Sequence, residues 1–208
     1  MKVLELFAGS RSISKEAEKL GMETFSTDIE QFGGIDYVVD ILDFKYAKLP
    51  FIPDIIWASP PCTAFSVASM THHWGGGYKA YKPKTKTARQ GIKLVERTVE
   101  IIDFFMHPGL IFYVENPRGI LRKLDLFHTL PAIRHTVTYC QYGDTRMKPT
   151  DIWTNNIPWR PRLVCKNGDP CHERAPRGCK TGGTQGMSNA YDRAKIPREL
   201  CNEVLTNV

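Results

Sequence analysis

The chain has 208 residues, of which 42% are hydrophobic and 24% charged, and its formal net charge is +6. This length allows one domain with a sizeable core. No apolar run approaches the roughly 18 residues that a membrane-spanning helix needs, and residues 1–7 lack the features of a signal peptide, so we expect no membrane association. Six cysteines are too few for a disulfide scaffold and indicate a reducing cytoplasm. The positive charge favours a polyanionic partner.

The predicted elements alternate between strands and helices along the chain. Apolar segments predict strands at residues 3–7, 23–28, 37–40, 54–58 and 110–115, with a later pair at 137–142 and 151–155. Helices are predicted at residues 13–20, 88–106 and 197–206. This alternation predicts an α/β fold with a mostly parallel sheet and a late antiparallel strand pair.

Polar or small residues follow the first five predicted strands. Gly9 comes after the first strand, Asp28 and Asp40 end the next two, Cys62 follows the fourth, and Glu115 ends the fifth. Ligands of parallel sheets bind beyond the carboxyl ends of the strands. Because chance would scatter these residues between the two edges of the sheet, the sequence predicts one site at a single edge.

The segment 59–62, Ser-Pro-Pro-Cys, places a thiol where the chain leaves a buried strand. Two consecutive prolines fix φ and remove backbone donors, so the chain must leave the sheet there. A thiol and the carboxylate of Glu115, each at the end of a buried strand, suggest covalent chemistry on an electrophilic ring. A cysteine that only fills the core is the alternative, and we apply that interpretation to Cys140 and Cys201.

Residues 7–12, Phe-Ala-Gly-Ser-Arg-Ser, form a small-residue turn between a strand and a helix. Such a turn lets a ligand approach the backbone, and Asp28 follows at the spacing of an acid that binds ribose. The G-x-G-x-x-G fingerprint is absent, as is a P-loop, so the turn suits a nucleoside-type cofactor without a pyrophosphate. S-adenosylmethionine (SAM) is the obvious candidate, and a purely structural turn is the alternative.

Segments 4–10, 59–62 and 114–116 occur in the order of the cofactor, nucleophile and carboxylate motifs of the DNA (cytosine-5) methyltransferases, which they resemble. Residues 141–155 resemble the later basic motif of that family, and residues 189–200 loosely resemble its final motif. The match is closest to compact members from phages and related genomes. It implies a Rossmann-like SAM-dependent methyltransferase fold, a single catalytic domain over residues 1–208, DNA as partner, and the cytoplasm of a bacterial or phage-infected cell.

The same resemblance implies roles for individual residues. Cys62 would bond transiently to carbon 6 of cytosine, Glu115 would hold the ring, and Arg146 and Lys148 would lower the pKa of the thiol. Asn116 would brace the strand end. The cofactor residues implied are Phe7, Ala8, Gly9, Ser10, Asp28, Ile29, Asp40, Ser59 and Pro60. The chain departs from the family where Ser10, Arg11 and Ser12 replace glycines, where Pro117 replaces an aliphatic residue, and where Lys148 replaces an arginine.

A basic stretch with interleaved aromatic residues follows the nucleophile, at positions 71–89. Its cations could neutralise phosphates of a nucleic acid; they are Lys79, Lys82, Lys84, Lys86 and Arg89. In the family, the loop after the nucleophile closes over a flipped base. A solvated loop without a partner is the alternative.

Residues 156–185 form a small irregular insert at the place of the family's larger target-recognition region. So short an insert predicts a short or relaxed target, or help from a specificity partner. It contains Cys165, Cys171, His172 and Cys179, which could hold a structural zinc ion. An irregular basic loop with reduced thiols is the alternative.

Three other functions remain open at the level of the sequence. The same chemistry could act on RNA, or the enzyme could transfer another sulfonium-borne group or act on a nucleotide. A non-catalytic nucleic-acid binder on the same fold is the third, although intact Cys62 and Glu115 argue against it. No feature of the sequence indicates an oligomeric state.

Overall fold

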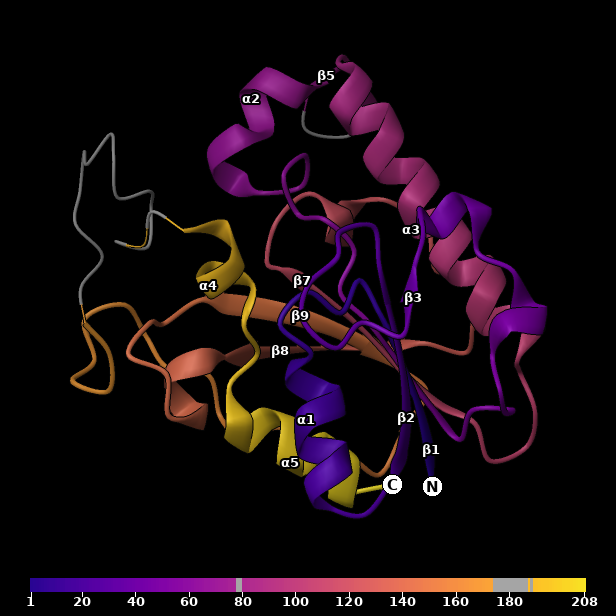
Figure 1. Cartoon of the computed structure of the whole chain (residues 1–208). Helices are drawn as coiled ribbons and strands as arrows, with labels where there is room; N and C mark the ends of the chain where they lie inside the picture. The colour runs from indigo at the N-terminus through magenta and orange to yellow at the C-terminus, as the bar shows by residue number, and fades with distance from the viewer. Residues whose placement is uncertain (78–79, 174–186, 188) are drawn as a thin grey trace.

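The computed structural model describes residues 1–77, 80–173, 187 and 189–208. Of the predicted site residues, Lys79 and Cys179 lie outside these described residues. A seven-stranded sheet runs through the centre of the molecule in the order β3-β2-β1-β4-β7-β9-β8 (Figure 1). The strands are β1 (Lys2–Leu6), β2 (Glu23–Asp28), β3 (Tyr37–Val38), β4 (Ile55–Ala58), β7 (Ile111–Pro117), β8 (Ile133–Thr138) and β9 (Pro149–Thr154).

Strands β3, β2, β1, β4 and β7 pair in parallel, and β9 is antiparallel to both of its neighbours, β7 and β8. Val3 pairs with Ile55, which pairs with Ile111, so the three central strands are in one register. The predicted mostly parallel sheet with a late antiparallel pair is therefore confirmed. The carboxyl ends of five parallel strands share one edge.

Helices cover both faces of the sheet (Figure 1). On one face, α1 (Ser12–Lys19) and α5 (Arg198–Thr206) pack on the sheet through Ile13 and Leu200, which share a core with Trp57 of β4. On the other face, α3 (Lys86–Phe104) contributes Val95 and Val99 to a second core. Two shorter helices are α2 (Met70–His73) and α4 (Ala190–Ala194), and β5 (Trp74–Gly75) pairs with β6 (Lys82–Pro83) in a small hairpin. Among the described residues, no helix has the length and apolar character needed to cross a membrane.

The predicted strand at residues 137–142 is wrong in its second half. β8 begins earlier, at Ile133, and residues 139–142 form a short 3-10 helix, η5 (Tyr139–Tyr142), which ends at Gly143 with φ +83°. The β8–β9 ladder ends where Thr138 faces Pro149, and a proline has no N–H to continue it. The chain therefore turns here and places η5 beside the sheet edge.

Candidate active site

The turn after β1 is tightly wound at the carboxyl edge of the sheet. Phe7 and Arg11 have φ of +56° and +55°, and Gly9 has φ of +47°. Non-glycine residues in this conformation are strained and persist only when their surroundings hold them. The Ala8 N–H donates to Thr27 O at 2.9 Å, and the Gly9 N–H donates to Asp28 Oδ2 at 2.9 Å. The end of the neighbouring strand β2 thus holds the turn in place. The other side of the turn is free to face a ligand.

This turn forms one wall of a cavity of about 490 Å³, a volume within the usual range for small-molecule sites. The opposite wall comes from the chain after β4 and from the ends of β7 and β9. Predicted residues that line the cavity are Phe7, Ala8, Gly9, Ser10, Ser59, Pro60, Cys62, Glu115 and Lys148. Both the cofactor motif and the nucleophile motif therefore face one space, as the strand ends predicted.

Cys62 lies at this cavity on a loop that three hydrogen bonds hold in place. Its carbonyl accepts from Phe65 N at 2.9 Å and from Ser66 N at 3.0 Å, and the side-chain amide of Asn116 donates to Pro60 O at 2.8 Å. The expectation that Asn116 braces this strand end is confirmed. The loop is also packed against Gly119, where a Cβ would lie 2.1 Å from the Phe65 carbonyl oxygen. Only glycine permits that approach.

Glu115 is buried, with 4% of its surface exposed, and it has two polar neighbours. The Tyr139 hydroxyl donates to Glu115 Oε1 at 3.0 Å, and Lys148 Nζ lies 3.9 Å from the same oxygen. Lys148 also donates to the Arg193 carbonyl at 3.1 Å, and its backbone has φ of +27°. Carboxylate, ammonium and thiol therefore line the same cavity, and an aromatic hydroxyl braces the carboxylate.

The pKa of Cys62 is raised, mainly because burial penalises the thiolate and secondly because Glu115 is negative. Lys148 and, more weakly, Arg193 act in the opposite direction. Lys148 lowers the pKa of this thiol, as expected for a basic neighbour, but burial outweighs its charge in the free protein, so the net shift is upward rather than downward. Burial also lowers the pKa of Lys148, although Glu115 opposes that shift. The thiol is accordingly neutral at pH 7 before a ligand binds.

Arg146, predicted beside Lys148, is not among the residues that line this cavity. Its guanidinium donates to Asp144 Oδ1 at 2.9 Å and to the Arg193 carbonyl at 3.2 Å. Arg193, near the start of the last motif, lines the cavity instead, and sequence reasoning missed it. The local pattern gave no signal for Arg193, because α4 is brought to the site by a long connection.

The residues expected around a nucleoside occupy the same edge but lie outside the cavity lining. The carboxylate of Asp28 accepts from Gly9 and Glu30 N–H groups, at 2.9 and 3.0 Å, and Asp40 accepts from Leu42 N at 3.0 Å. Ile29 is 64% exposed, which leaves an apolar surface beside these acids. The Asp28 carboxylate suits the ribose hydroxyls of SAM, and the exposed Ile29 side chain suits its adenine. The small residues at the Gly9 turn suit its methionine part.

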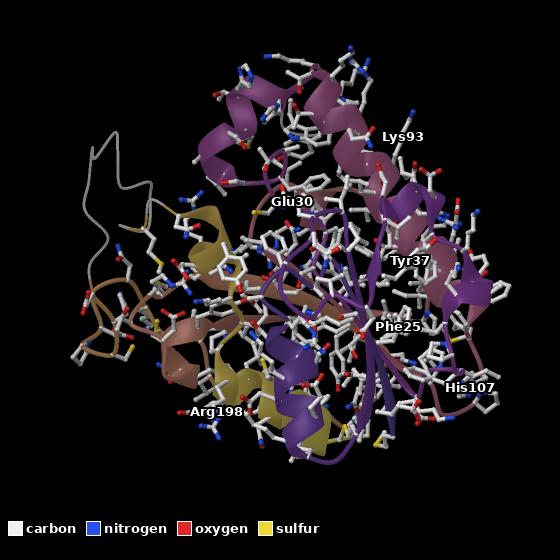
Figure 2. All side chains as sticks on the ribbon, viewed as in Figure 1. Phe25, Glu30, Tyr37, Lys93, His107 and Arg198 are labelled. Carbon is white, nitrogen blue, oxygen red and sulfur yellow. The ribbon has the colours of Figure 1, made fainter. Side chains whose placement is uncertain are left out.

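The basic stretch lies next to this site. A groove of about 670 Å³ lies between the first turns of α3 and the loop at Pro61 and Thr63. These two loop residues also line the cavity. Lys86 and Arg89 line the groove, as does Lys93, which lies on the outer side of α3 (Figure 2) and which sequence reasoning missed. Lys82 and Lys84 are exposed on and just after β6, and Lys84 Nζ donates to Thr71 O at 2.9 Å. A basic groove therefore leads to Cys62.

Cys165, Cys171 and His172 lie together, away from the cavity, and they are joined there by Cys140. Cys140, interpreted from the sequence as a residue that only fills the core, is buried, and its sulfur also lies 3.2 Å from that of Cys165. Cys201, by contrast, is a fully buried residue of α5 and belongs to the core between that helix and the sheet.

Comparison with known proteins agrees with this architecture. No family model matches the chain. A probable DNA (cytosine-5)-methyltransferase of Frog virus 3 (isolate Goorha) is 32% identical over 181 residues, covering 85% of this chain and 81% of that protein. The Dnmt2 methyltransferase of S. pombe has the same fold, with a TM-score of 0.50, 13% identity, and coverage of 77% of this chain and 52% of its own. A Dnmt2 mutant of Spodoptera frugiperda aligns with a TM-score of 0.46, 17% identity, and coverage of 81% and 57%. The chain spans about half the length of these solved structures.

The sheet order is that of the Rossmann-like methyltransferase fold, and the cavity lies at the carboxyl edge of its parallel strands. On the identity and coverage shared with the viral protein, the chain belongs to the DNA (cytosine-5) methyltransferase family. It is a SAM-dependent enzyme of the cytosine-5 class.

Proposed function

We propose that this protein methylates carbon 5 of cytosine in DNA through a covalent bond between Cys62 and carbon 6 of the base. The observation that carries the proposal is the convergence of Cys62, Glu115 and Lys148 on the cavity whose other wall is the turn after β1. The basic groove that opens beside Cys62 supports a polyanionic substrate. The viral relative's name, which specifies DNA, supports DNA over RNA.

The chemistry requires a nucleophile because carbon 5 of cytosine is itself too weak to attack a methyl sulfonium. The Cys62 thiol loses its proton and its sulfur bonds to carbon 6, while Glu115 holds the ring at N3 and stabilises the charge that develops there. SAM, when bound, supplies the electrophilic methyl group. Loss of the carbon 5 proton to solvent then allows the bond between Cys62 and carbon 6 to break. This releases Cys62 as a thiolate, which takes up a proton from solvent and returns to the thiol.

Each remaining residue acts on one of these steps. Lys148 places a positive charge beside Cys62 and Glu115, and it offsets the negative charge when the thiolate forms. Tyr139 keeps Glu115 facing the cavity. Phe7, Gly9 and Ser59 line the cofactor side of the cavity. A base inside a duplex cannot reach Cys62, so the target must be flipped out or single-stranded.

We further propose that the whole chain works as one catalytic domain, and that residues 156–185 are its target-recognition insert. The described part of this insert is anchored by Trp159, which is 2% exposed and donates to Glu203 Oε1 at 3.0 Å. Bisulfite sequencing of DNA from expressing cells is expected to show a short or relaxed target. A strict six-base-pair site would contradict this role for so small an insert.

The decisive test uses DNA that contains 5-fluorocytosine. Fluorine at carbon 5 cannot leave as a cation, so an enzyme that methylates this base in the presence of SAM stays bonded to it. We expect a denaturation-resistant adduct with the wild type and with Cys201→Ala, and none with Cys62→Ala. An adduct with Cys62→Ala would contradict the proposal. A folded wild type that forms no adduct would contradict it as well.

Two further arms separate the remaining alternatives. The same base placed in RNA is expected to trap much less enzyme, and preferential trapping by RNA would assign the chemistry to RNA. Mass spectra of nucleosides from unmodified DNA are expected to show 5-methylcytosine, whereas a larger group at carbon 5 would indicate transfer of another sulfonium-borne group.

A further inference from the structure

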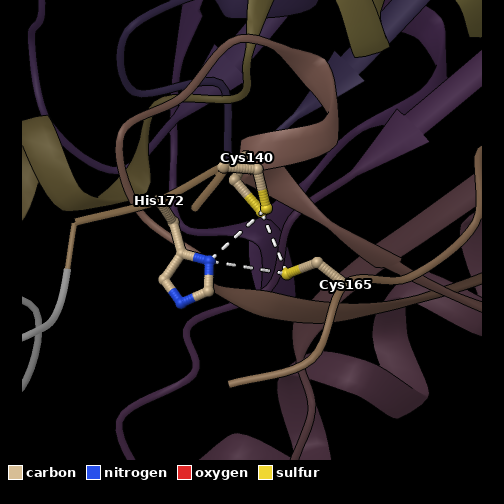
Figure 3. A group of neighbouring side chains, drawn as sticks. Cys140, Cys165 and His172 are labelled. Carbon is tan, nitrogen blue, oxygen red and sulfur yellow. Dashed lines mark hydrogen bonds between the residues drawn. The ribbon is translucent and has the colours of Figure 1, made fainter. Parts of the chain in front are cut away.

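Four side chains of the types that ligate metals meet outside the cavity at Cys62, at the edge of the sheet beyond β8. Cys140 belongs to η5, and the others come from the irregular segment 160–173. The sulfur atoms of the three cysteines and a ring nitrogen of His172 all lie within 4.8 Å of one another. Figure 3 shows Cys140, Cys165 and His172 pointing into the same small space.

The distances within this cluster suit one shared ion. The Sγ of Cys140 lies 3.2 Å from that of Cys165 and 3.6 Å from that of Cys171. Nδ1 of His172 lies 3.7 Å from the Cys165 sulfur and 3.6 Å from the Cys171 sulfur. Around a tetrahedral zinc ion with bonds of about 2.3 Å to sulfur, neighbouring sulfurs are about 3.8 Å apart. A disulfide, with a bond of about 2.05 Å, would join only two of the three thiols and leave the imidazole without a role.

We propose that the protein binds one structural Zn²⁺ through the Sγ atoms of Cys140, Cys165 and Cys171 and through Nδ1 of His172. This set replaces the one predicted from sequence, because Cys140 supplies the fourth position that Cys179 was expected to fill. The three thiols give up their protons to solvent as the ion binds, and His172 binds in its neutral form. Four protein ligands leave no open position, so the ion is structural rather than catalytic.

The surroundings of the cluster are arranged for a metal. The Cys165 N–H donates to Thr138 Oγ1 at 3.1 Å, and the side-chain amide of Gln141 donates to the Cys171 sulfur at 3.3 Å. The N–H donor from Gln141 to the Cys171 sulfur stabilises a thiolate, and the bond to Thr138 fixes the backbone at Cys165. Gly168, with φ of +100°, closes a turn between Cys165 and Cys171 and brings the two cysteines to the same side.

Arg162 holds the start of the segment through ion pairs with Glu199 and Glu203, but apolar packing contributes little beyond it. Leu163 and Val164 are 87% and 51% exposed, so the segment has no apolar core of its own. A metal ion supplies the stabilisation that small irregular segments otherwise lack. Beyond the ligands, the Glu173 N–H donates to Thr145 O at 2.8 Å. The ion therefore ties the insert to the loop that leads to Lys148, and this structural role does not rest on the proposed reaction.

The test measures zinc in the purified full chain by mass spectrometry of the metal. We expect about one zinc per wild-type chain, loss of most of it in Cys140→Ser, and full retention in Cys179→Ser. Each of these two variants removes one thiol, and they differ only in which cysteine is replaced. Zinc that survives Cys140→Ser but is lost from Cys179→Ser would overturn the assignment of Cys140, and a wild type without stoichiometric zinc would overturn the site.

A second measurement guards against a variant that merely misfolds. Wild type reconstituted with Co²⁺ is expected to show intense thiolate-to-metal absorption and tetrahedral d–d bands, and a chelator is expected to lower its Tm by at least about 5 °C. Cys62→Ala should keep both properties. A wild-type mass that is 2 Da lower without reductant, together with no cobalt spectrum, would show a disulfide instead and would contradict the proposal.

Discussion

Cys62 lies between opposing electrostatic influences. Burial and the charge of Glu115 raise the pKa of its thiol, whereas Lys148 lowers it. The free enzyme therefore keeps the sulfur neutral, and a neutral thiol resists oxidation and unwanted alkylation. The thiolate is needed only once a base occupies the cavity.

This balance predicts a pH dependence. Because the pKa of Cys62 is raised, the thiolate fraction is small at pH 7 and grows up to about tenfold per pH unit below that pKa. We expect kcat/KM for methyl transfer to rise between pH 7 and 9. Lys148→Met removes the cation that lowers the pKa, so its profile should move to higher pH, whereas Lys148→Arg should stay closer to the wild type. Iodoacetamide labelling of the peptide that contains Cys62 measures the same titration, and a profile that does not change with pH would contradict this account.

The hydroxyl of Tyr139 is the second prediction at this scale. Tyr139→Phe keeps the ring, over which Lys148 Nζ lies 4.3 Å from the centroid, and removes only the hydrogen bond to Glu115. A hydrogen bond to a charged group contributes about 1.5–3 kcal/mol, so we expect kcat to fall at least about tenfold with little change in KM for SAM. Tyr142→Phe is the matched control, because Tyr142 lies in the same 3-10 helix but donates to Glu203, away from the cavity. Equal kcat values for Tyr139→Phe and the wild type would refute a positioning role.

At the scale of elements, the antiparallel edge of the sheet holds Lys148 and η5 in place. A buried ion pair locks this edge, because Arg122 donates to both oxygens of Asp151 of β9, at 2.8 and 2.7 Å. Asp151 is completely buried and also accepts from Thr136 of β8 at 2.8 Å. The pair thus joins the loop after β7 to β8 and β9.

Breaking this pair is expected to be costly. Arg122→Met leaves the Asp151 carboxylate buried without its cation, and such a change costs about 3–5 kcal/mol. Urea unfolding should show that loss. Arg162→Met is the control, because its partners Glu199 and Glu203 are more exposed and such pairs contribute less than about 1 kcal/mol. Similar losses in the two variants would show that burial does not decide the strength of this pair.

The whole molecule presents a basic groove on the side of the sheet covered by α3, and it opens beside Cys62. Each phosphate contact contributes about 0.9 to the slope of log K against log salt on duplex DNA. Lys86→Gln combined with Lys93→Gln is expected to reduce that slope by about 1.8 and to weaken DNA binding uniformly across sequences. The control pair, Lys45→Gln with Lys48→Gln, lies before β4, near the opposite end of α3, and should leave the slope unchanged. A slope that responds to the control and not to Lys86 and Lys93 would place DNA elsewhere.

The order of the elements, and the edge of the sheet that carries the site, follow from the amino-acid sequence. Strands and helices follow local periodicity, and the end of a parallel strand is a topological position, so Gly9, Cys62 and Glu115 had to share one edge once the sheet was parallel. The resemblance to a family added the roles of Cys62 and Glu115.

The residues that complete the sites from distant parts of the chain are known only from the assembled fold. Arg193 lines the cavity while Arg146 pairs with Asp144, because the position of α4 depends on packing far from the motif. Cys140 joins Cys165 because the ladder stops at Pro149 and turns η5 toward the insert. Burial likewise reversed the expected shift in the pKa of Cys62. Long-range contacts and desolvation depend on the assembled fold, and no local pattern records them.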